Sequence, residues 1–423
     1  MFRTLKDAWK IEEIRKKVYF TLLMIVVYRF GNNIPIPFID QQALKEAFSG
    51  MEGTLVDYLN MLTGGGLSQL SIFALGVQPY ITASIVMQLL TVAIPKLEEL
   101  TKEGEQGRKQ IQRYTRYVTI FLAIFQSVAI TNGLFGQALA SATGFEKVVM
   151  NITLIAGTMF VTWMGETITD KGIGNGVSII IFLGIIAHIP TTLSSWKQGL
   201  HYDTISVISI IVMVVIVLLI VIAVVEITEG ERKIPIQYAK RVVGRKMYGG
   251  QSTHIPVKVN MGGVMPIIFA SAVLAIPSTI ALFVGGSSSN FVQNLLGNGA
   301  LGTTIYLLIQ SALIILFAYF YNMIQFNTVE YAKNLQQYGG FIPGIRPGRP
   351  TSEYLQKVSS RITFIGAISL AILTAVPTIA SNLLGLKLSF GGSSVIIIVG
   401  VVLETLKQIE AMATMKHYKG FLK

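Results

Sequence analysis

The sequence lacks cysteine entirely and has few charged side chains. None of its 423 residues is a cysteine, which excludes disulfides and thiolate metal sites. Charged residues make up 13% of the chain, whereas hydrophobic residues make up 52%. No soluble domain arrangement hides so large an apolar share, but a bundle of spanning helices exposes it to lipid. We therefore expect an all-α integral membrane protein.

Sequence signatures of enzymes are also missing. The chain has no GxxxxGK[ST] phosphate loop, no HExxH zinc motif and no GxSxG nucleophile elbow. Its four histidines are scattered along the sequence rather than grouped as metal ligands. We expect no enzymatic activity, cofactor or metal, so any work that the protein does must draw on an outside source of energy.

Long apolar runs, by contrast, are abundant. A span needs about 20 largely apolar residues, and the sequence predicts ten transmembrane helices in two inverted halves of five around a central pore. The halves are residues 1–196 and 197–423. Because five is odd, the second half crosses the membrane opposite to the first, and inverted repeats place a transport path at their interface. The predicted spans are 18–34, 70–94, 115–134, 148–167, 176–194, 205–226, 264–284, 304–326, 361–380 and 393–411.

The net charge of +12 is distributed unevenly over these spans. With the N-terminus inside, most of the 34 lysines and arginines fall on that side of the membrane. The opposite side holds only Lys45, Lys147, Lys197 and Lys387, and Arg29 lies within the first span. Because basic loops stay on the cytoplasmic side, we expect a multi-pass membrane protein with both termini in the cytoplasm.

Two loops on the inside contain strand-like and turn-forming patterns that the orientation of the protein in the membrane does not by itself require. Residues 227–263 place basic residues on alternating apolar stretches around Gly244, which predicts a basic, hairpin-like finger. Residues 327–360 contain GGFIPGIRPGRPT, whose glycines and prolines fix turns that present Arg346 and Arg349 outward. Ordered basic loops favour a docking platform for RNA or an acidic protein face. The alternative is that they only set the orientation and contact lipid phosphates.

The stretch Gly64–Pro95 combines apolar residues with features that a lipid-facing anchor does not need. It begins as a glycine hinge after a short, weakly apolar helix at 55–63 and continues as a long apolar helix. In a bilayer, irregular backbone and polar groups are tolerated only where protein or a water-filled cavity receives them. We expect this segment to line a cavity. Its interrupting residues are Gln78, Pro79, Thr82, Ser84 and Gln88.

Charged residues inside the spans are few, and Arg29 and Glu404 are the main ones. Arg29 either fixes the first helix through an ionic or carbonyl contact or extends toward an interface. Lys407, one turn from Glu404, favours a local structural role for that carboxylate. An ion-coupled carrier usually places more charges near the midplane, whereas a conduit closed by an apolar constriction does not need them.

Long blocks of distinctive sequence follow one another along the chain: SIFALGVQPYITASIVMQLL, GIGNGVSIIIF, AKRVVGRK, STHIPVKVNMGGVMPIIFA and FIPGIRPGRPT. These blocks resemble the SecY family, the central channel subunits of the bacterial Sec protein translocase. The resemblance covers Arg15 to about Lys416. It implies a channel that moves unfolded secretory polypeptides across the plasma membrane and releases transmembrane segments sideways into lipid through a lateral gate.

The resemblance also implies an hourglass pore with a ring of aliphatic side chains. Val77 and Ile81, like Val177 and Ile181, are four residues apart and therefore share one face of a helix. Apolar helices that only pack against their neighbours contain such pairs too, so the family match carries this assignment. The implied ring is Val77, Ile81, Val177, Ile181, Ile268 and Ile397.

A plug and a lateral gate are implied in the same way. The plug, about 55–66, would close the outer funnel and bend at its glycines, because glycine bends at little steric cost. The gate would lie between the second and seventh spans, and the alternative for each gate residue is a static contact between helices. The implied plug and hinge residues are Leu55, Tyr58, Leu59, Leu62, Gly64, Gly65 and Gly66. The implied gate residues are Thr82, Gln88, Gln126 and Asn260.

The partners are implied by the family as well. Arg245, Lys246, Arg346 and Arg349 resemble positions that engage the SecA motor ATPase and the ribosome. SecE and SecG would be the partner subunits. The substrates would be precursors of secretory and membrane proteins that carry signal sequences, and the lipid bilayer would surround the channel. The alternatives are an accessory SecY paralogue for a narrow substrate set, an ion-coupled solute carrier and a non-transporting scaffold.

Overall fold

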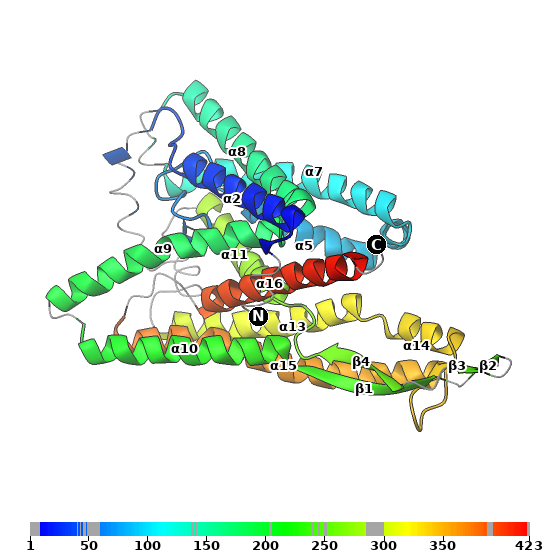
Figure 1. Cartoon of the computed structure of the whole chain (residues 1–423). Helices are drawn as coiled ribbons and strands as arrows, with labels where there is room; N and C mark the ends of the chain where they lie inside the picture. The colour runs from blue at the N-terminus through cyan, green and yellow to red at the C-terminus, as the bar shows by residue number, and fades with distance from the viewer. Residues whose placement is uncertain are drawn as a thin grey trace.

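The computed structural model describes residues 9–39, 41–42, 44, 48, 60–136, 139, 142–202, 205–238, 241–243, 246–248, 252–284, 300–386 and 392–420. Over these residues the chain is mostly helical, and long helices lie side by side (Figure 1). Each predicted span falls on a helix. These helices are α2 (Glu12–Asn32), α5 (Gln78–Ala93), α7 (Glu105–Ala129), α8 (Gly144–Lys171), α9 (Gly176–His201), α10 (Val207–Glu229), α11 (Met265–Val284), α13 (Ala300–Gln325), α15 (Arg349–Leu384) and α16 (Gly392–Gly420).

Not every helix meets the length and apolarity that a span requires. Among the described residues, 5 helices are long and apolar enough to cross a membrane. The number rises to 6 if α5 and α6 (Pro95–Lys102), which meet at a bend of 100°, form one span. The multi-pass character is therefore clear, and the count of ten spans stays a prediction.

The second predicted span begins later than the sequence indicated. Residues 72–77 form turns, and α5 begins at Gln78 rather than near residue 70. Gly76 has a φ of 54°, a left-handed conformation that ends regular structure, and Pro79 stands in the first turn of α5, where its missing N–H costs nothing. The residues before α5 are thus free to turn toward the centre of the bundle.

Polar caps fix where two further helices begin. Thr143 and Glu146 form a reciprocal capping box at the start of α8. The Asn175 side chain accepts hydrogen bonds from the backbone N–H groups of Val177 and Ser178 at the start of α9. These bonds satisfy donors that the first turn of a helix leaves unpaired. The position of Val177 along α9 is therefore set by its cap.

The finger predicted within residues 227–263 is a β structure, which confirms the hairpin. Strand β1 (Glu231–Tyr238) pairs antiparallel with β4 (Ser252–Lys258), so that Glu231 faces Lys258. Strands β2 (Arg241–Val243) and β3 (Lys246–Tyr248) form a second antiparallel pair. In Figure 1 this pair lies beyond the ends of β1 and β4, away from the helices.

The second basic loop joins the same sheet. Strand β5 (Gly340–Phe341) pairs with β1, giving the order β4-β1-β5, and follows α14 (Thr328–Gln337). An apolar cluster that includes Ile234, Val257 and Leu355 lies beneath the sheet and connects it to α15. The two loops that were predicted to be ordered therefore form one packed unit.

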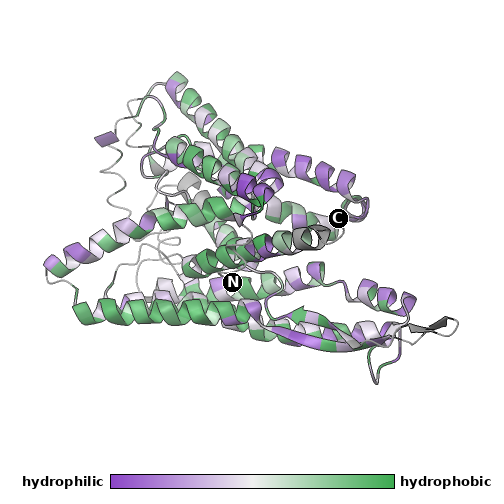
Figure 2. Cartoon of the chain, viewed as in Figure 1, coloured by the Kyte–Doolittle hydropathy of each residue, from purple (hydrophilic) through white to green (hydrophobic). Residues whose placement is uncertain are grey.

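The outer surface of the bundle is apolar over its middle. Figure 2 shows hydrophobic residues along α10 and hydrophilic residues at one end of the molecule, on α7 and the β strands. On α10, Ile208, Leu218 and Ile222 have large exposed fractions, 72%, 58% and 60%. Such a face agrees with lipid contact.

Two seams join the predicted halves. From the second half, α11 packs against α5 and α7, and α16 packs against α9 and α2. The largest apolar cluster of the molecule lies between these seams. The boundary predicted at residue 196 falls inside α9, which continues to His201, and the connection to α10 follows that helix. A path between the halves would therefore run through this central cluster.

Candidate functional site

The six predicted ring residues come together at the centre of the bundle. They extend from α5, α9, α11 and α16, or from the residue just before α5, so both predicted halves contribute. Val77, Ile81, Ile181, Ile268 and Ile397 are buried in the central apolar cluster, and Val177 packs against it partly buried. Branched aliphatic side chains from four helices thus belong to one packed cluster.

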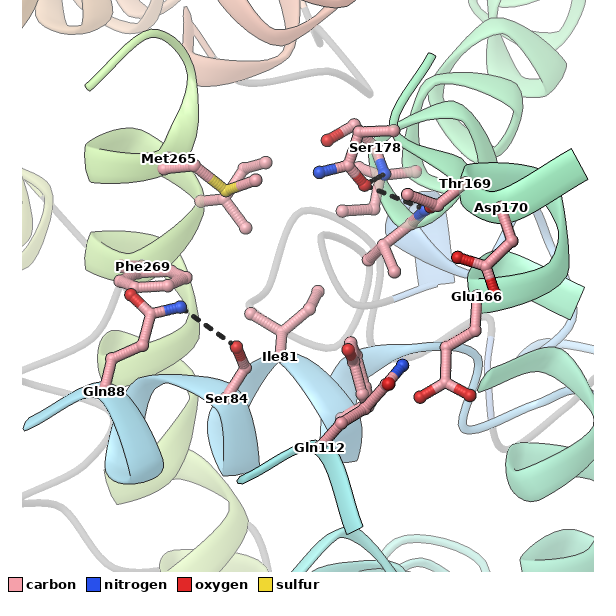
Figure 3. A pocket seen from close by; sticks show the side chains of 15 residues that line it. Ile81, Ser84, Gln88, Gln112, Glu166, Thr169, Asp170, Ser178, Met265 and Phe269 are labelled. Atoms are coloured by element: carbon pink, nitrogen blue, oxygen red, sulfur yellow. Dashed lines mark hydrogen bonds between the residues drawn. The ribbon is translucent and has the colours of Figure 1, made fainter. Parts of the chain in front are cut away.

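A cavity of about 240 Å³ lies against one side of this cluster. Figure 3 shows Ile81, Ser84 and Gln88 on α5, Met265 and Phe269 on α11, and Glu166, Thr169 and Asp170 on α8 around it. Four ring residues line it: Ile81, Val177, Ile181 and Ile268. Its polar lining comes from Ser84, Gln88, Gln112, Glu166, Thr169, Asp170, Asn175 and Ser178. The cavity therefore has both apolar and polar walls, and residues of the stretch Gly64–Pro95 line it, as the sequence predicted.

One of its carboxylates is held by an ion pair. Arg116 of α7 contacts Glu166 of α8 through two hydrogen bonds, Nε to Oε1 at 3.2 Å and Nη2 to Oε2 at 2.5 Å. The Glu166 side chain is 7% exposed, whereas that of Arg116 is 45% exposed. This bidentate pair joins α7 to α8 and compensates the charge of a nearly buried carboxylate. Arg116 and Glu166 lie 50 residues apart on different helices, so spacing along one helix does not reveal their pairing.

The seam between the halves is crossed by a side-chain hydrogen bond beside the cavity. The Tyr321 hydroxyl of α13 donates to the side-chain carbonyl oxygen of Gln88 at 3.0 Å, and the Gln88 amide donates to Ser84 at 3.2 Å. The Tyr321 ring packs against Phe269 of α11, with centroids 5.2 Å apart. Gln88 is thus the predicted gate residue that contacts the opposite half. Tyr321 was not predicted, although its hydroxyl in an apolar span was a visible signal.

The other predicted gate residues occupy different surroundings. Thr82 is buried and donates to the Gln78 carbonyl within α5, at 3.1 Å. Asn260 donates to the Gly263 carbonyl within its own loop, at 2.9 Å. Gln126 is partly exposed on α7, a helix that packs against α11. These side-chain hydrogen bonds of Thr82 and Asn260 stay within one segment, so their part in a gate remains a prediction.

The inner end of the predicted plug is tied to α2. Leu55, Tyr58 and Leu59 lie outside the described residues, but residues 60–62 are helical and Leu62 is partly buried. The Gly64 carbonyl accepts from the Asn32 amide at 2.8 Å and from the Arg29 guanidinium at 3.3 Å. Of the two roles considered for Arg29, a contact that fixes the first helix and an extension toward the membrane interface, the structure shows the first, through a backbone carbonyl.

The glycines at the end of this helix adopt the predicted turn. Gly64 and Gly65 have φ values of 70° and 88°, which side chains with a Cβ rarely adopt. A Cβ on Gly66 would lie 2.3 Å from the Asn32 side-chain oxygen. The Tyr28 hydroxyl also donates to the Thr63 carbonyl, at 3.1 Å. The glycines thus give a close, multiply bonded turn in this structure.

Along α5 and α9, contacts with the plug end, ring residues and cavity-lining residues follow one another in the same order, and α16 contacts the plug end next to its ring residue. On the α5 side, Gly76 lies against Thr63, the ring residues follow, and Ser84 and Gln88 line the cavity. On α9, Gly184 lies against Leu62, and the ring residue Ile181 comes between it and the cavity. On α16, the Ser394 hydroxyl donates to the Met61 sulfur at 3.5 Å, one turn before the ring position. The ring therefore separates the plug end from the polar cavity.

The local role of Glu404 differs from the prediction. Lys407 does not provide its ion pair among the described contacts, because Lys407 lies 3.9 Å from Glu229 at the end of α10. Glu404 is exposed on α16. Lys407 therefore contacts the neighbouring helix α10.

The predicted docking residues lie on the sheet unit and its loop. Arg346 is exposed, and Arg349 is exposed at the start of α15, where it pairs with Glu353 at 2.9 Å. Between β5 and α15, Gly344 and Gly348 have φ values of 81° and 98°, so glycines do set this turn. Lys246 lies in β3, and Arg245 lies outside the described residues. Arg346 and Arg349 therefore face solvent at the end of one rigid loop.

Comparisons with known proteins agree with this arrangement. The SecY family model matches residues 71–406. A relative from Streptomyces galbus, named protein translocase subunit SecY, is 46% identical, and the alignment covers 100% of both chains. The fold is similar to a solved structure described as a protein conducting channel, with a TM-score of 0.67 and 18% identity over 94% of this chain and 92% of that one. It also resembles Sec61 in a canine ribosome-channel complex, with a TM-score of 0.60 and 16% identity over the same shares. The model match and the full-length relative together show that this chain belongs to the SecY family.

Proposed function

We propose that this chain is a protein-conducting channel that moves unfolded secretory polypeptides across the bacterial plasma membrane. The observation that carries the proposal is the order of plug end, aliphatic ring and polar cavity along α5 and α9. Family membership and the resemblance to solved channel structures support it. A non-transporting scaffold would have no use for this order.

The chemistry of the ring suits a channel for chains of varied sequence. Valine and isoleucine side chains offer no hydrogen-bonding groups, so they do not hold a passing peptide backbone. Without a passing chain, the same apolar constriction excludes water and ions. Aliphatic side chains form no hydrogen bonds or ion pairs with one another, so only packing holds these six together.

The lateral gate belongs to this proposal as its finer part. It would open along the seam of α5 and α7 with α11 and α13, where the Gln88–Tyr321 bond joins the halves. On the opposite seam, the Gly174 backbone N–H donates to the Gln408 side chain, and Gly174 fits against Thr405 so closely that a Cβ would lie 3.0 Å from its hydroxyl. The seam at Gln88 is held by side chains that can exchange hydrogen-bond partners, whereas the seam at Gly174 is packed on backbone. We therefore expect the seam at Gln88 to open more readily.

Orientation and partners are also part of the proposal. Both termini and the sheet unit would face the cytoplasm, as the basic loops indicate. The exposed Arg346 and Arg349, with Lys246 in β3, would contact the SecA motor or the ribosome. SecE and SecG would bind the apolar outer faces of the bundle, and the Sec61 relative solved with a ribosome supports the ribosome as a partner.

A crosslinking experiment tests the central claim. A photoreactive residue at Ile268, which is 6% exposed in the ring, should crosslink to a secretory precursor stalled during export. The matched control is Ile365 on the outer face of α15, which is 63% exposed and should not crosslink to that precursor. An intact stalled precursor that labels neither position, or both equally, contradicts the proposal. Precursor-independent uptake of a solute would instead support the carrier alternative.

A further inference from the structure

A serine hydroxyl in the centre of the bundle is buried without a partner. Ser271 of α11 is 4% exposed, and in the described part of the chain its Oγ forms no hydrogen bond. Serines of apolar helices usually bond to the preceding turn, as Ser127 does to the Ile124 carbonyl at 3.0 Å. Because an unpaired buried hydroxyl costs free energy, Ser271 marks a place where a ligand would restore a lost hydrogen bond.

The position of Ser271 follows from the helix that carries it. The ring residue Ile268 comes three residues earlier, so Ser271 lies one turn further along α11 on the same face. Met265, Ile268 and Phe269 line the polar cavity, and Figure 3 shows the first and last of them there, whereas Ser271 does not line it. Seen from the cavity, Ser271 therefore lies beyond the ring.

A second buried hydroxyl reaches the same level from α16. Gly400 lies so close to Val264, directly before α11, that a Cβ would be 2.5 Å from the valine side chain. From this contact both helices reach the ring in opposite chain directions, and one turn further they bring Ser394 level with Ser271. Ser394 is fully buried, and its hydroxyl donates to the sulfur of Met61 at 3.5 Å. Since a thioether is a weak acceptor, both hydroxyls at the level of the plug end lack a strong partner.

The chemistry of a translocating chain fits these two hydroxyls. Whatever its sequence, a polypeptide carries a C=O acceptor on every residue and an N–H donor on every residue except proline. Inside the aliphatic ring these groups lose water and find no hydrogen-bonding side chain, which is costly. A hydroxyl both donates and accepts, so it can bond to either backbone group as the group leaves the ring.

We propose that Ser271 and Ser394 bind the backbone of the translocating polypeptide directly beyond the ring. This inference rests on the proposed function and names the part of the substrate that is bound there. Replacing the plug end by a polypeptide gives Ser271 a partner and exchanges the sulfur acceptor of Ser394 for a peptide group, which favours the occupied channel. Sites in a conduit must also release what they bind, and neutral hydrogen bonds offered to each residue in turn meet that need.

Backward sliding of a stalled chain tests the site. A precursor is halted in vesicles with the complete translocase, ATP is removed, and the loss of the chain from the channel is timed. Ser271→Ala should speed this loss about fivefold, as expected for one hydrogen bond of about 1 kcal/mol. Ser394→Ala should act in the same direction. Ser271→Thr keeps the hydroxyl and should slide as the unmodified channel does, so equal acceleration by the alanine and threonine variants overturns the assignment.

Thr363 provides a matched control for the loss of an unpaired hydroxyl. It is also 4% exposed, and its hydroxyl also forms no hydrogen bond within the described residues. It belongs to α15, which carries none of the ring residues. Thr363→Val should therefore leave the sliding rate unchanged. If it accelerates sliding as much as Ser271→Ala does, the effect comes from the fold in general and the site is refuted.

The sequence of the stalled segment separates backbone binding from side-chain binding. Two precursors are halted with either an alanine-rich or a glutamine-rich stretch in the channel. Ser271→Ala should speed the sliding of both by the same factor, because their backbones are alike, and an effect on the glutamine-rich chain alone contradicts the proposal. Crosslinking from Ile268 to the same stalled chains is measured in parallel. Crosslinks without any change in sliding refute only the hydroxyl site, whereas absent crosslinks refute the proposed function.

Discussion

The Tyr321 hydroxyl of α13 donates to the side-chain carbonyl oxygen of Gln88 in α5 at 3.0 Å, although the two residues are 233 positions apart. The bond is neutral, and Gln88 keeps a second partner, Ser84, on its own helix. Hydrogen bonds between transmembrane helices contribute about 0.6 kcal/mol on average. A contact of this strength can hold a resting seam and still give way to a passing segment.

Removing this hydroxyl should favour the open seam. Tyr321→Phe keeps the ring that packs against Phe269 but loses the bond to Gln88. We expect about threefold more export of a precursor with a weakened signal sequence, which corresponds to losing one interhelical hydrogen bond. The measurement is export into vesicles at equal amounts of translocase.

The same helix provides a matched control for this prediction. The Tyr319 hydroxyl donates to the Ser360 carbonyl at 3.4 Å, and both residues belong to the second half. Tyr319→Phe therefore removes the same group without touching the seam. Equal gains in the two variants would show that the Gln88 contact does not hold the gate.

The aliphatic ring should determine the ion leak of the resting channel. Combining Ile81→Gly, Ile181→Gly and Ile268→Gly removes three aliphatic side chains of the proposed ring. The constriction then becomes wider and less apolar, so it excludes water and ions less well. We expect a several-fold rise of resting conductance in planar bilayers. The control combines Ile85→Gly, Ile185→Gly and Ile267→Gly, which are buried in the same helices but do not line the cavity. A similar leak in both triple variants contradicts the assignment.

The sequence predicted the elements that depend on local pattern. Apolar runs located a helix at each of ten ranges, and alternating basic and apolar residues predicted the finger that β1 and β4 form. The start of α5 was placed too early, because the apolar composition of residues 70–77 conceals a left-handed Gly76 and a turn. Periodicity reports the environment of side chains, whereas the start of a helix depends on individual backbone angles.

Contacts between distant segments were beyond the reach of one sequence. Gln88 was chosen as a polar residue in an apolar helix, but nothing in the pattern names Tyr321 as its partner. Lys407 was matched with Glu404 because they are neighbours on a helix, and the structure pairs it with Glu229 of another helix. The ring residues depended on the family resemblance, since many buried isoleucines have the same spacing.

Reversing the charge of Arg346 should prevent docking without affecting the membrane part. Arg346 is exposed on a loop that glycines and β5 hold in place, so a glutamate there leaves the packing unchanged. Like charges across an interface cost several kcal/mol. We expect Arg346→Glu to lower SecA-driven export more than about tenfold while insertion and assembly persist. Lys333→Glu, on the exposed face of α14, is the matched control, and normal export by Arg346→Glu refutes the docking role.

The seat of the plug end on α9 should be sensitive to a single methyl group. A Cβ on Gly184 would lie 2.5 Å from the Leu62 carbonyl oxygen and 3.0 Å from that of Met61, so Gly184→Ala pushes against backbone rather than against a movable side chain. Overpacking of this kind costs about 1–3 kcal/mol, and about 1 kcal/mol changes an equilibrium roughly fivefold.

Gly184→Ala should therefore displace the plug end and raise the resting open probability at least about fivefold in single-channel recordings. Gly144→Ala is the control, because a Cβ there meets no atom within 4 Å and the residue also lies in a helix. Asn32→Ala removes the 2.8 Å bond to the Gly64 carbonyl and should shift the channel in the same direction by another route. If channels with Gly184→Ala and channels with Gly144→Ala have the same resting open probability, the packing of residues 61–62 on α9 does not keep the pore closed. If only Asn32→Ala opens the channel, the turn at Gly64 holds the closed state without help from the packing on α9.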